Sequence, residues 1–429
     1  MKYSGIKWIG EIPDNWNVRK VKQCFYISKE QAHEENPIIL SLARAGVKVR
    51  DISNNEGQLA ASYDNYNPVM PGDLLLNPMD LYSGANCSLS EVSGVISPAY
   101  INLRKKVELN PKFYDYYFKT QYWAMAMFAH GKGVSFDNRW TMNAETLLNY
   151  YLPFTSSDVQ DKIVDLINKK TAEIDSLIEI ENQQIEKLKE YKQAVITEAV
   201  TRGLDKKVPL KDSGVEWIGK IPEGWSIQKV LYQLSMPVTD GPHTTPELQP
   251  EGVAFVSAEA VSCGNGGIDF SHIRGYITEE FYQECCLKYI PEIDDVYMIK
   301  SGATTGRVSI VTTLEPKFTI WSPLAVMRCD KNKMFPKFLY YAVQSEQFQR
   351  QVALGWSFGT QQNLGMRTLE QLKLIIPALS EQKDIANYLD MKIGDIEKAI
   401  KVKNEKIERL DEYKKSIIYE YVTGKKEVC

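Results

Sequence analysis

Three short segments of the chain hold residue types that could carry chemistry, and each lacks part of the pattern that its chemistry needs. Residues 77–80, "NPMD", are similar to the methyltransferase motif N-P-P-[YF] but lack the aromatic ring that stacks on a flipped base. Residues 301–309, "SGATTGRVS", do not match the phosphate-binding pattern GxxxxGK[ST]. Residues 263–267, "CGNGG", favour a tight turn, because Gly and Asn tolerate positive φ. The sequence therefore predicts a protein without a catalytic centre of its own.

The cysteines and histidines do not form a recognisable metal or catalytic pattern. The seven cysteines include no CxxC, and the four histidines have no nearby ligand spacing typical of zinc and no acid and nucleophile at a recognisable spacing. The N-terminus lacks an apolar signal core, and no run of 18 apolar residues predicts a membrane span. These features favour a protein of the cytoplasm with reduced thiols and no membrane partner.

The composition is that of a globular protein of several domains. The 429 residues are 44% hydrophobic and 25% charged, with a net charge of −4. No segment is strongly basic, so a surface that binds DNA would have to arise from local clustering of charge.

Side chains suited to base edges and phosphates lie in segments that read as loops. Arg pairs with guanine, and Asn or Gln with adenine. In the first half the candidates for DNA binding are Arg44, Lys48, Arg50, Tyr82, Asn86, Asn138 and Arg139. In the second half they are His243, Thr244, Thr245, Lys300, Thr304, Thr305, Arg307, Gln361, Gln362 and Asn363. A solvated loop is the alternative for each single residue, although binding residues concentrate on loops that a rigid scaffold holds.

The elements that must position these loops occur twice. The string "WIGEIPDNW" at residues 8–16 returns as "WIGKIPEGW" at 217–225, within a longer match of residues 4–21 to 213–230 that has no gap. We call each of these two strings a WIG segment. One interpretation is that its tryptophans pin the start of each half onto its own domain. The other is that they dock a partner, as exposed Trp often does at interfaces.

A second repeat closes each half and predicts a long helix. Apolar residues recur at steps of 3, 4 and 7, with matching positions 222 residues apart from Gln160 and Gln382 onwards. Each proline-free stretch predicts a helix of about 43 residues, or roughly 65 Å. Because a one-sided apolar stripe does not stabilise so long a helix alone, we expect the two to pair as an antiparallel coiled coil.

The middle of each half shows a fainter repeat of strand-like segments. Residues 70–88 resemble 290–309, and 96–103 resemble 321–328. We therefore expect an α+β fold in which two divergent domains are each followed by a long helix, with pseudo-two-fold symmetry. The expected boundaries are 1–155 and 204–378 for the domains and 156–203 and 379–424 for the helices.

This organisation resembles the specificity subunit of type I restriction-modification enzymes. The WIG segment of each half, the strands followed by Ser-Gly-Ala, and "IPALSEQKDI" at the start of the second helix carry the resemblance. The first helix departs from the pattern, because "LPFTSSDVQDKI" is two residues longer and has Val159 before Gln160.

The resemblance implies a non-catalytic subunit whose two target-recognition domains bind an asymmetric, bipartite sequence in double-stranded DNA. It also implies two adenine methyltransferase (modification) subunits and ATP-dependent restriction subunits as partners. No cofactor is expected on this chain, whereas S-adenosylmethionine, ATP and Mg are expected on the partners. A helical adaptor that does not bind DNA is the alternative.

Overall fold

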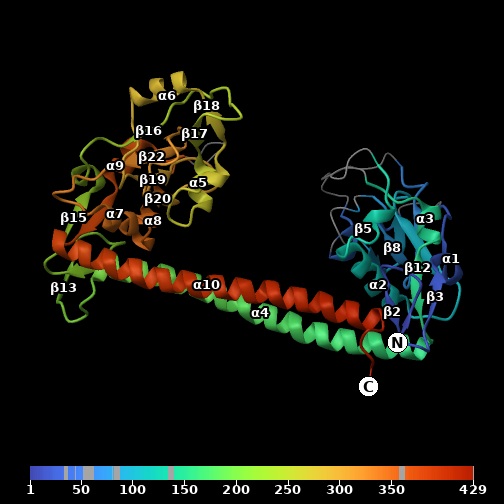
Figure 1. Ribbon diagram of the computed structural model, residues 1–429. Helices are drawn as coiled ribbons and strands as arrows, with labels where there is room; N and C mark the ends of the chain where they lie inside the picture. Colours follow the sequence, from blue (N-terminus) through green and yellow to red (C-terminus); the bar gives the residue numbers. More distant parts are fainter. Residues whose placement is uncertain are drawn as a thin grey trace. The chain divides into compact units, whose positions relative to one another are not determined.

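The computed structural model describes residues 1–32, 37–43, 45–51, 62–79, 81, 87–133, 140–356 and 363–428. The chain forms two compact units, Met1–Glu181 with Asn404–Cys429, and Asn182–Lys403 (Figure 1), which we call unit 1 and unit 2. Two long helices, α4 (Ser157–Arg202) and α10 (Leu379–Val422), contribute to both units. Among the described residues, no helix combines the length and apolar character that crossing a membrane requires.

Unit 1 is an α+β domain of short strands. Its remaining elements are β1 (Lys2–Tyr3), β2 (Glu11–Ile12), β3 (Asn17–Lys20), α1 (Val21–Cys24), β4 (Phe25–Ile27), β5 (Leu40–Ala43), β6 (Gly46–Val49), β7 (Asn67–Val69), β8 (Leu74–Leu76), β9 (Cys87–Leu89), β10 (Gly94–Ile96), β11 (Ile101–Lys105), α2 (Pro111–Trp123), η1 (Phe128–His130), α3 (Ala144–Leu148) and β12 (Tyr151–Phe154). The central sheet has the order β4-β11-β8-β9, and all its neighbours are antiparallel. Strand β12 pairs with β3 and leads into α4.

Unit 2 repeats this plan with added helices. Its remaining elements are β13 (Leu210–Asp212), β14 (Lys220–Pro222), β15 (Ser226–Lys229), η2 (Val230–Gln233), β16 (Thr239–Asp240), β17 (Val253–Val256), α5 (Ala258–Cys263), η3 (Phe270–His272), β18 (Gly275–Ile277), α6 (Glu279–Cys286), β19 (Val296–Ile299), β20 (Val308–Ile310), β21 (Phe318–Ile320), β22 (Leu324–Met327), α7 (Pro336–Ala342), α8 (Glu346–Leu354), α9 (Met366–Gln371) and β23 (Lys373–Ile376). The central sheet, β16-β22-β19-β20, corresponds to β4-β11-β8-β9. Strand β23 pairs with β15 and leads into α10, as β12 does for α4.

A buried ion pair at the same place in both central sheets fixes this correspondence. In unit 1 the guanidinium of Arg104 donates to Asp73 with an Nε–Oδ1 distance of 2.8 Å, and in unit 2 Arg328 donates to Asp295 at 2.7 Å. Both carboxylates are almost fully buried, and the hydrogen bond to each raises the pKa of its arginine. The similarity of residues 96–103 to 321–328 is therefore offset by one residue near its end, because Arg104 matches Arg328.

The long helices pair along their predicted apolar faces. Ile167 of α4 and Leu389 of α10 are fully buried. The side-chain contacts between α4 and α10 keep one antiparallel register in both units: Asp175–Lys414 and Glu181–Lys406 at 2.6 Å in unit 1, and Lys192–Glu397 at 2.6 Å and Gln184–Lys403 in unit 2. The predicted α+β class and the antiparallel pairing of two long helices are confirmed.

The second tryptophan of each WIG segment is buried at the end of a long helix. Trp16 is 4% exposed and lies against Gly424, just after α10, where an added Cβ would approach the indole to 3.2 Å. Trp225 is 3% exposed, lies equally close to Gly203 after α4, and donates its Nε1–H to Glu381 at 2.9 Å. Both glycines have positive φ, which ends the helix there. These two tryptophans are thus packed inside their own units, where the cited contacts hold them against the ends of the long helices and not only against the domain that follows the WIG segment.

Candidate nucleic-acid interface

The predicted DNA-binding residues fall into two groups. Seven lie outside the described residues: Arg44, Tyr82, Asn86, Asn138, Arg139, Gln361 and Gln362. The other ten are placed by the structure, two of them in unit 1 and eight in unit 2.

In unit 1, Lys48 and Arg50 belong to the β5–β6 hairpin and its continuation. Lys48 lies opposite Ser41 in the ladder and is exposed. Arg50 is half-buried, and its backbone N–H donates to the carbonyl of Ile39 at 2.8 Å. The hairpin thus places one exposed cation beside a second basic residue whose backbone is tied to the sheet.

In unit 2, Thr304, Thr305 and Arg307 lie in the connection from β19 to β20. The connection is a closed turn, because the Gly306 N–H donates to Ile299 at 2.8 Å and the Thr305 hydroxyl donates to the Gly302 carbonyl at 2.7 Å. Gly302 and Gly306 both have positive φ, a backbone conformation that glycine adopts more easily than other residues. This explains the two glycines in "SGATTGR". The turn leaves Arg307 exposed.

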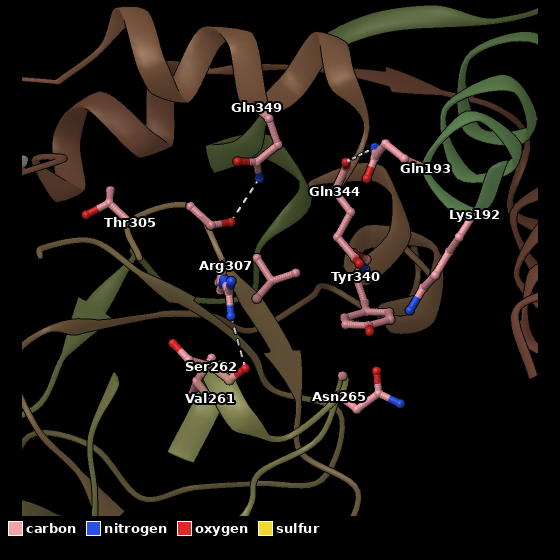
Figure 2. A pocket seen from close by; sticks show the side chains of 13 residues that line it. Lys192, Gln193, Val261, Ser262, Asn265, Thr305, Arg307, Tyr340, Gln344 and Gln349 are labelled. Carbon is pink, nitrogen blue, oxygen red and sulfur yellow. Dashed lines mark hydrogen bonds between the residues drawn. The ribbon is translucent and has the colours of Figure 1, made fainter. Parts of the chain in front are cut away.

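An open hollow of about 340 Å³ lies beside this turn (Figure 2). Lys192 from α4 and Tyr340 lie on one side of it, and Arg307 lies on the other, where its Nη1 donates to the carbonyl of Ser262 at 3.2 Å. Burial raises the pKa of Tyr340 to about 12, so its hydroxyl stays protonated. The residues that line the hollow include two cations and several amides but no carboxylate, although Lys192 is paired with Glu397, outside the lining, at 2.6 Å. Arg307 and the amides are therefore the groups suited to an anion or a polar base edge.

Lys300 and His243 converge on a residue that sequence reasoning missed, Asp240. The Asp240 side chain is fully buried at the end of β16. Lys300 Nζ lies 3.3 Å from Asp240 Oδ2, and His243 Nε2 lies 3.1 Å from the same oxygen. Lys288, also missed, forms an ion pair with Asp240 Oδ1 and donates to the carbonyl of Gly241 at 3.3 Å. We call these four side chains the Asp240 cluster.

The exposure of the basic groups in the Asp240 cluster differs. The side chain of Lys300 is 11% exposed, whereas those of Lys288 and His243 are 46% and 71% exposed. Thr244 and Thr245, which follow His243, are exposed as well. Asn363 is also exposed and forms a β-bridge with Ser301, next to Lys300. The cluster therefore links the predicted segments 243–245 and 300–307 through one buried carboxylate.

A hollow of about 200 Å³ lies beside the cluster. Asp240, Lys288 and Glu284 contribute charged groups to its wall, and Phe281 and Tyr289 contribute aromatic rings. Burial, together with the neighbouring Tyr297 and Asp295, raises the pKa of Tyr289, so its hydroxyl stays neutral and donates to Asp295 at 2.5 Å.

The enzyme-like fragments have structural roles where the structure describes them. The Asn77 side chain accepts the backbone N–H of Met79 at 2.9 Å and so closes a turn. His272 does have an acid and a hydroxyl beside it, a grouping that sequence reasoning missed. However, Asp269 and Ser271 contact the same ring nitrogen, Nδ1, at 2.7 and 3.0 Å, so no relay from acid through histidine to hydroxyl is formed. Among the described residues, no three acid, His or Cys side chains are grouped to hold a metal ion.

Comparison with known proteins gives consistent matches. Residues 249–409 match the family described as the type I restriction modification DNA specificity domain. The chain is 25% identical over 291 residues to the putative type I restriction enzyme MjaX specificity subunit of Methanocaldococcus jannaschii, a match that covers 67% of this chain and 62% of that protein. It is 22% identical over 363 residues to the type I restriction enzyme MjaVIII specificity subunit of the same organism, covering 83% and 80%.

The fold is also found among solved structures. A chain from a structure of a type I R-M system, described in terms of complex assembly and conformational transition, superimposes with a TM-score of 0.69. The match covers 96% of this chain and 98% of that one at 14% sequence identity.

Proposed function

Because the chain belongs to the family of type I restriction-modification specificity subunits, we propose that it recognises a DNA sequence for a methyltransferase complex and has no catalytic role itself. In this proposal residues 1–155 and 204–378 each bind one part of an asymmetric, bipartite target in double-stranded DNA. The helices at 156–203 and 379–424 connect the two domains and leave a spacer unread.

The observation that carries this proposal is that the two units share one plan at their helices but differ at the ends of their sheets. The ion pairs Asp73–Arg104 and Asp295–Arg328 occupy matching places. By contrast, the β5–β6 hairpin of unit 1 corresponds to β17 and β18 of unit 2, which are separated by α5 and η3. Two equal scaffolds that carry different surface segments are suited to binding two different half-sites.

We further propose that the repeated WIG segments and helices bind two adenine methyltransferase subunits and, in the larger complex, restriction subunits. The first tryptophan of the second WIG segment, Trp217, supports this role because it is 42% exposed. S-adenosylmethionine, ATP and Mg would be held by those partners in the cytoplasm.

A genome-wide adenine-methylation profile tests this function. Cells expressing the chain with its methyltransferase subunit should methylate an interrupted, asymmetric motif. Replacement of residues 204–378 by the matching region of a relative with another specificity should change one half of that motif and leave the other unchanged. A continuous motif, or a change in both halves, would contradict the two-domain proposal. A helical adaptor that does not bind DNA would leave the methylated sequence unchanged after the replacement.

A further inference from the structure

The Asp240 cluster holds more positive charge than its buried carboxylate needs. A fully buried carboxylate is costly unless a cation neutralises it, and Lys300, itself only 11% exposed, already provides one. Lys288 is a second cation on the same carboxylate, and its side chain is 46% exposed. The surplus charge therefore lies at the surface, where a solvated anion could reach it.

The backbone at Gly241 brings these groups together. A Cβ at position 241 would lie 2.0 Å from the carbonyl oxygen of Ile320, so only glycine lets the chain run this close to the end of β21. The turn that follows carries His243 back over Asp240, three residues earlier in the chain. Lys288, just after α6, contacts both the carboxylate and the Gly241 carbonyl. Three separate segments are thus held at one point on the surface of unit 2.

We propose that Asp240 is a positioning residue that presents Lys288 and His243 to one backbone phosphate of bound DNA. The proposal rests on the proposed function and names a contact within it. A lysine ammonium has three donors, and the two contacts of Lys288 to Asp240 and Gly241 leave one for a phosphate oxygen. His243 lies beside it at 71% exposure, and because its Nε2 faces Asp240, only the doubly protonated ring would offer a second N–H to the phosphate. Such a contact fixes the position of the domain on the duplex without selecting a base.

The surroundings of the cluster include further charges of both signs. Glu284 of α6 lines the adjacent hollow and is exposed, so solvent screens it more than the buried groups. The guanidinium of Arg274 lies 4.2 Å from the ring centre of Trp321, which directly follows β21. This exposed arginine extends the basic surface beyond the cluster.

Unit 1 has a lysine, and not a carboxylate, at the ladder position that Asp240 occupies in unit 2. Thr239 and Asp240 of β16 pair with Val326 and Ala325, and in unit 1 the chain after β4 continues the matching ladder with Ser28, whose N–H donates to Asn102 at 2.9 Å. The next residue, Lys29, stands where unit 2 has Asp240. The carboxylate that positions Lys288 therefore has no counterpart at this ladder position of unit 1.

The salt dependence of DNA binding by the full chain tests the proposal. The probe is a fluorescein-labelled 30-base-pair duplex of mixed sequence, since a phosphate contact does not depend on sequence. We expect Lys288→Met to weaken binding roughly fivefold to tenfold near 0.1 M salt and to reduce the slope of log K against log salt by about 1. The control is Lys331→Met, another exposed lysine in an ion pair, with Asp294, which should leave the slope unchanged.

The direction in which a second variant changes DNA affinity shows whether Asp240 positions Lys288 or acts only through its own negative charge. Removal of a negative charge near DNA should strengthen binding, whereas Asp240→Asn should weaken it if the carboxylate holds Lys288 in place. The double variant Asp240→Asn, Lys288→Met should then bind about as weakly as Lys288→Met alone. Stronger binding by Asp240→Asn, or an unchanged slope for Lys288→Met, would overturn the proposal.

Two outcomes keep this proposal separate from the proposed function. If the unaltered chain shows no salt-dependent affinity for any duplex, the proposed function itself fails. If the unaltered chain binds and Lys288→Met binds equally well, only the Asp240 cluster is wrongly assigned. Thermal unfolding of each variant shows whether it is folded, and if Asp240→Asn is not, the slope of Lys288→Met decides the question.

Discussion

In unit 1 the side chain of Gln160 accepts the backbone N–H of Asn110 at 2.8 Å, and in unit 2 Gln382 accepts that of Phe335 at the same distance. Each glutamine is fully buried near the start of a long helix and satisfies the residue before a second helix, α2 or α7. The same polar contact has thus been kept at the place where each domain joins its long helix.

The connections at the ends of the sheets, by contrast, differ between the two units. Residues 44–45 separate β5 from β6, whereas residues 257–274, with α5 and η3, separate β17 from β18. The Asp240 cluster lies in unit 2 at a place where unit 1 has Lys29. Buried polar contacts tolerate little change because each lost partner leaves an unsatisfied group, while surface connections can change length at small cost. The comparison separates a shared scaffold from two different binding surfaces.

The largest expected effect is the loss of a buried tryptophan from a WIG segment. Trp16→Ala and Trp225→Ala should each lower the free energy of unfolding by about 3–5 kcal/mol, because each opens a cavity beside a helix end. Chemical denaturation measures the loss. The control is Trp217→Ala, which should cost much less because Trp217 is 42% exposed.

The same tryptophans also test whether the shared scaffold contributes to stability and assembly but not to sequence recognition. The double variant Trp16→Ala, Trp225→Ala should impair stability or assembly but leave the methylated sequence unchanged. A change in that sequence would show that the WIG segments contribute to recognition, and the comparison between scaffold and surface would then be wrong.

The next effect in size concerns the buried glutamines. Gln160→Leu and Gln382→Leu keep the volume but remove the acceptor for Asn110 or Phe335 and the donor to a backbone carbonyl, at Thr155 or Pro377. We expect each to destabilise the protein by about 2–4 kcal/mol in urea unfolding. A near-zero effect at one site and a large effect at the other would show that the shared contact is not equivalent in the two units.

The scaffold could be predicted from the sequence because its signals are local and repeated. The steps of 3, 4 and 7 that predicted the long helices include Ile167 and Leu389, which are fully buried in the cores that these helices share with the domains. Trp16 and Trp225 stand at the same position of a repeated string and are buried alike. A periodic apolar pattern involves residues within a few turns of each other, so it can be recognised in the sequence without knowledge of the rest of the fold.

The candidate site was predictable only in part, because its charges are paired over long distances in the sequence. Lys300 lies in a glycine-rich turn that reads as solvated, yet it neutralises Asp240, sixty residues earlier. Lys288 follows α6 in "CCLKYI", which has no turn or loop signal, and was missed although it is partly exposed. A pattern within one segment cannot show that a buried carboxylate from another strand will organise the lysines.

The smallest expected effect is a gain that makes unit 2 more like unit 1. Glu181 pairs with Lys406 in unit 1, and at the matching place in unit 2 Lys403 contacts the uncharged Gln184. Gln184→Glu should therefore turn the hydrogen bond between Gln184 and Lys403 into a charged one and raise the free energy of unfolding by about 0.3–0.5 kcal/mol at low salt. The gain should vanish in 1 M NaCl, where the charges are screened. The reciprocal control, Glu181→Gln in unit 1, should lose at least as much, because the Glu181 side chain is only 8% exposed. If Gln184→Glu instead destabilised the protein, the contacts of the helix pair would not be interchangeable, and the equivalence of the two units would stop short of the centre of the helices.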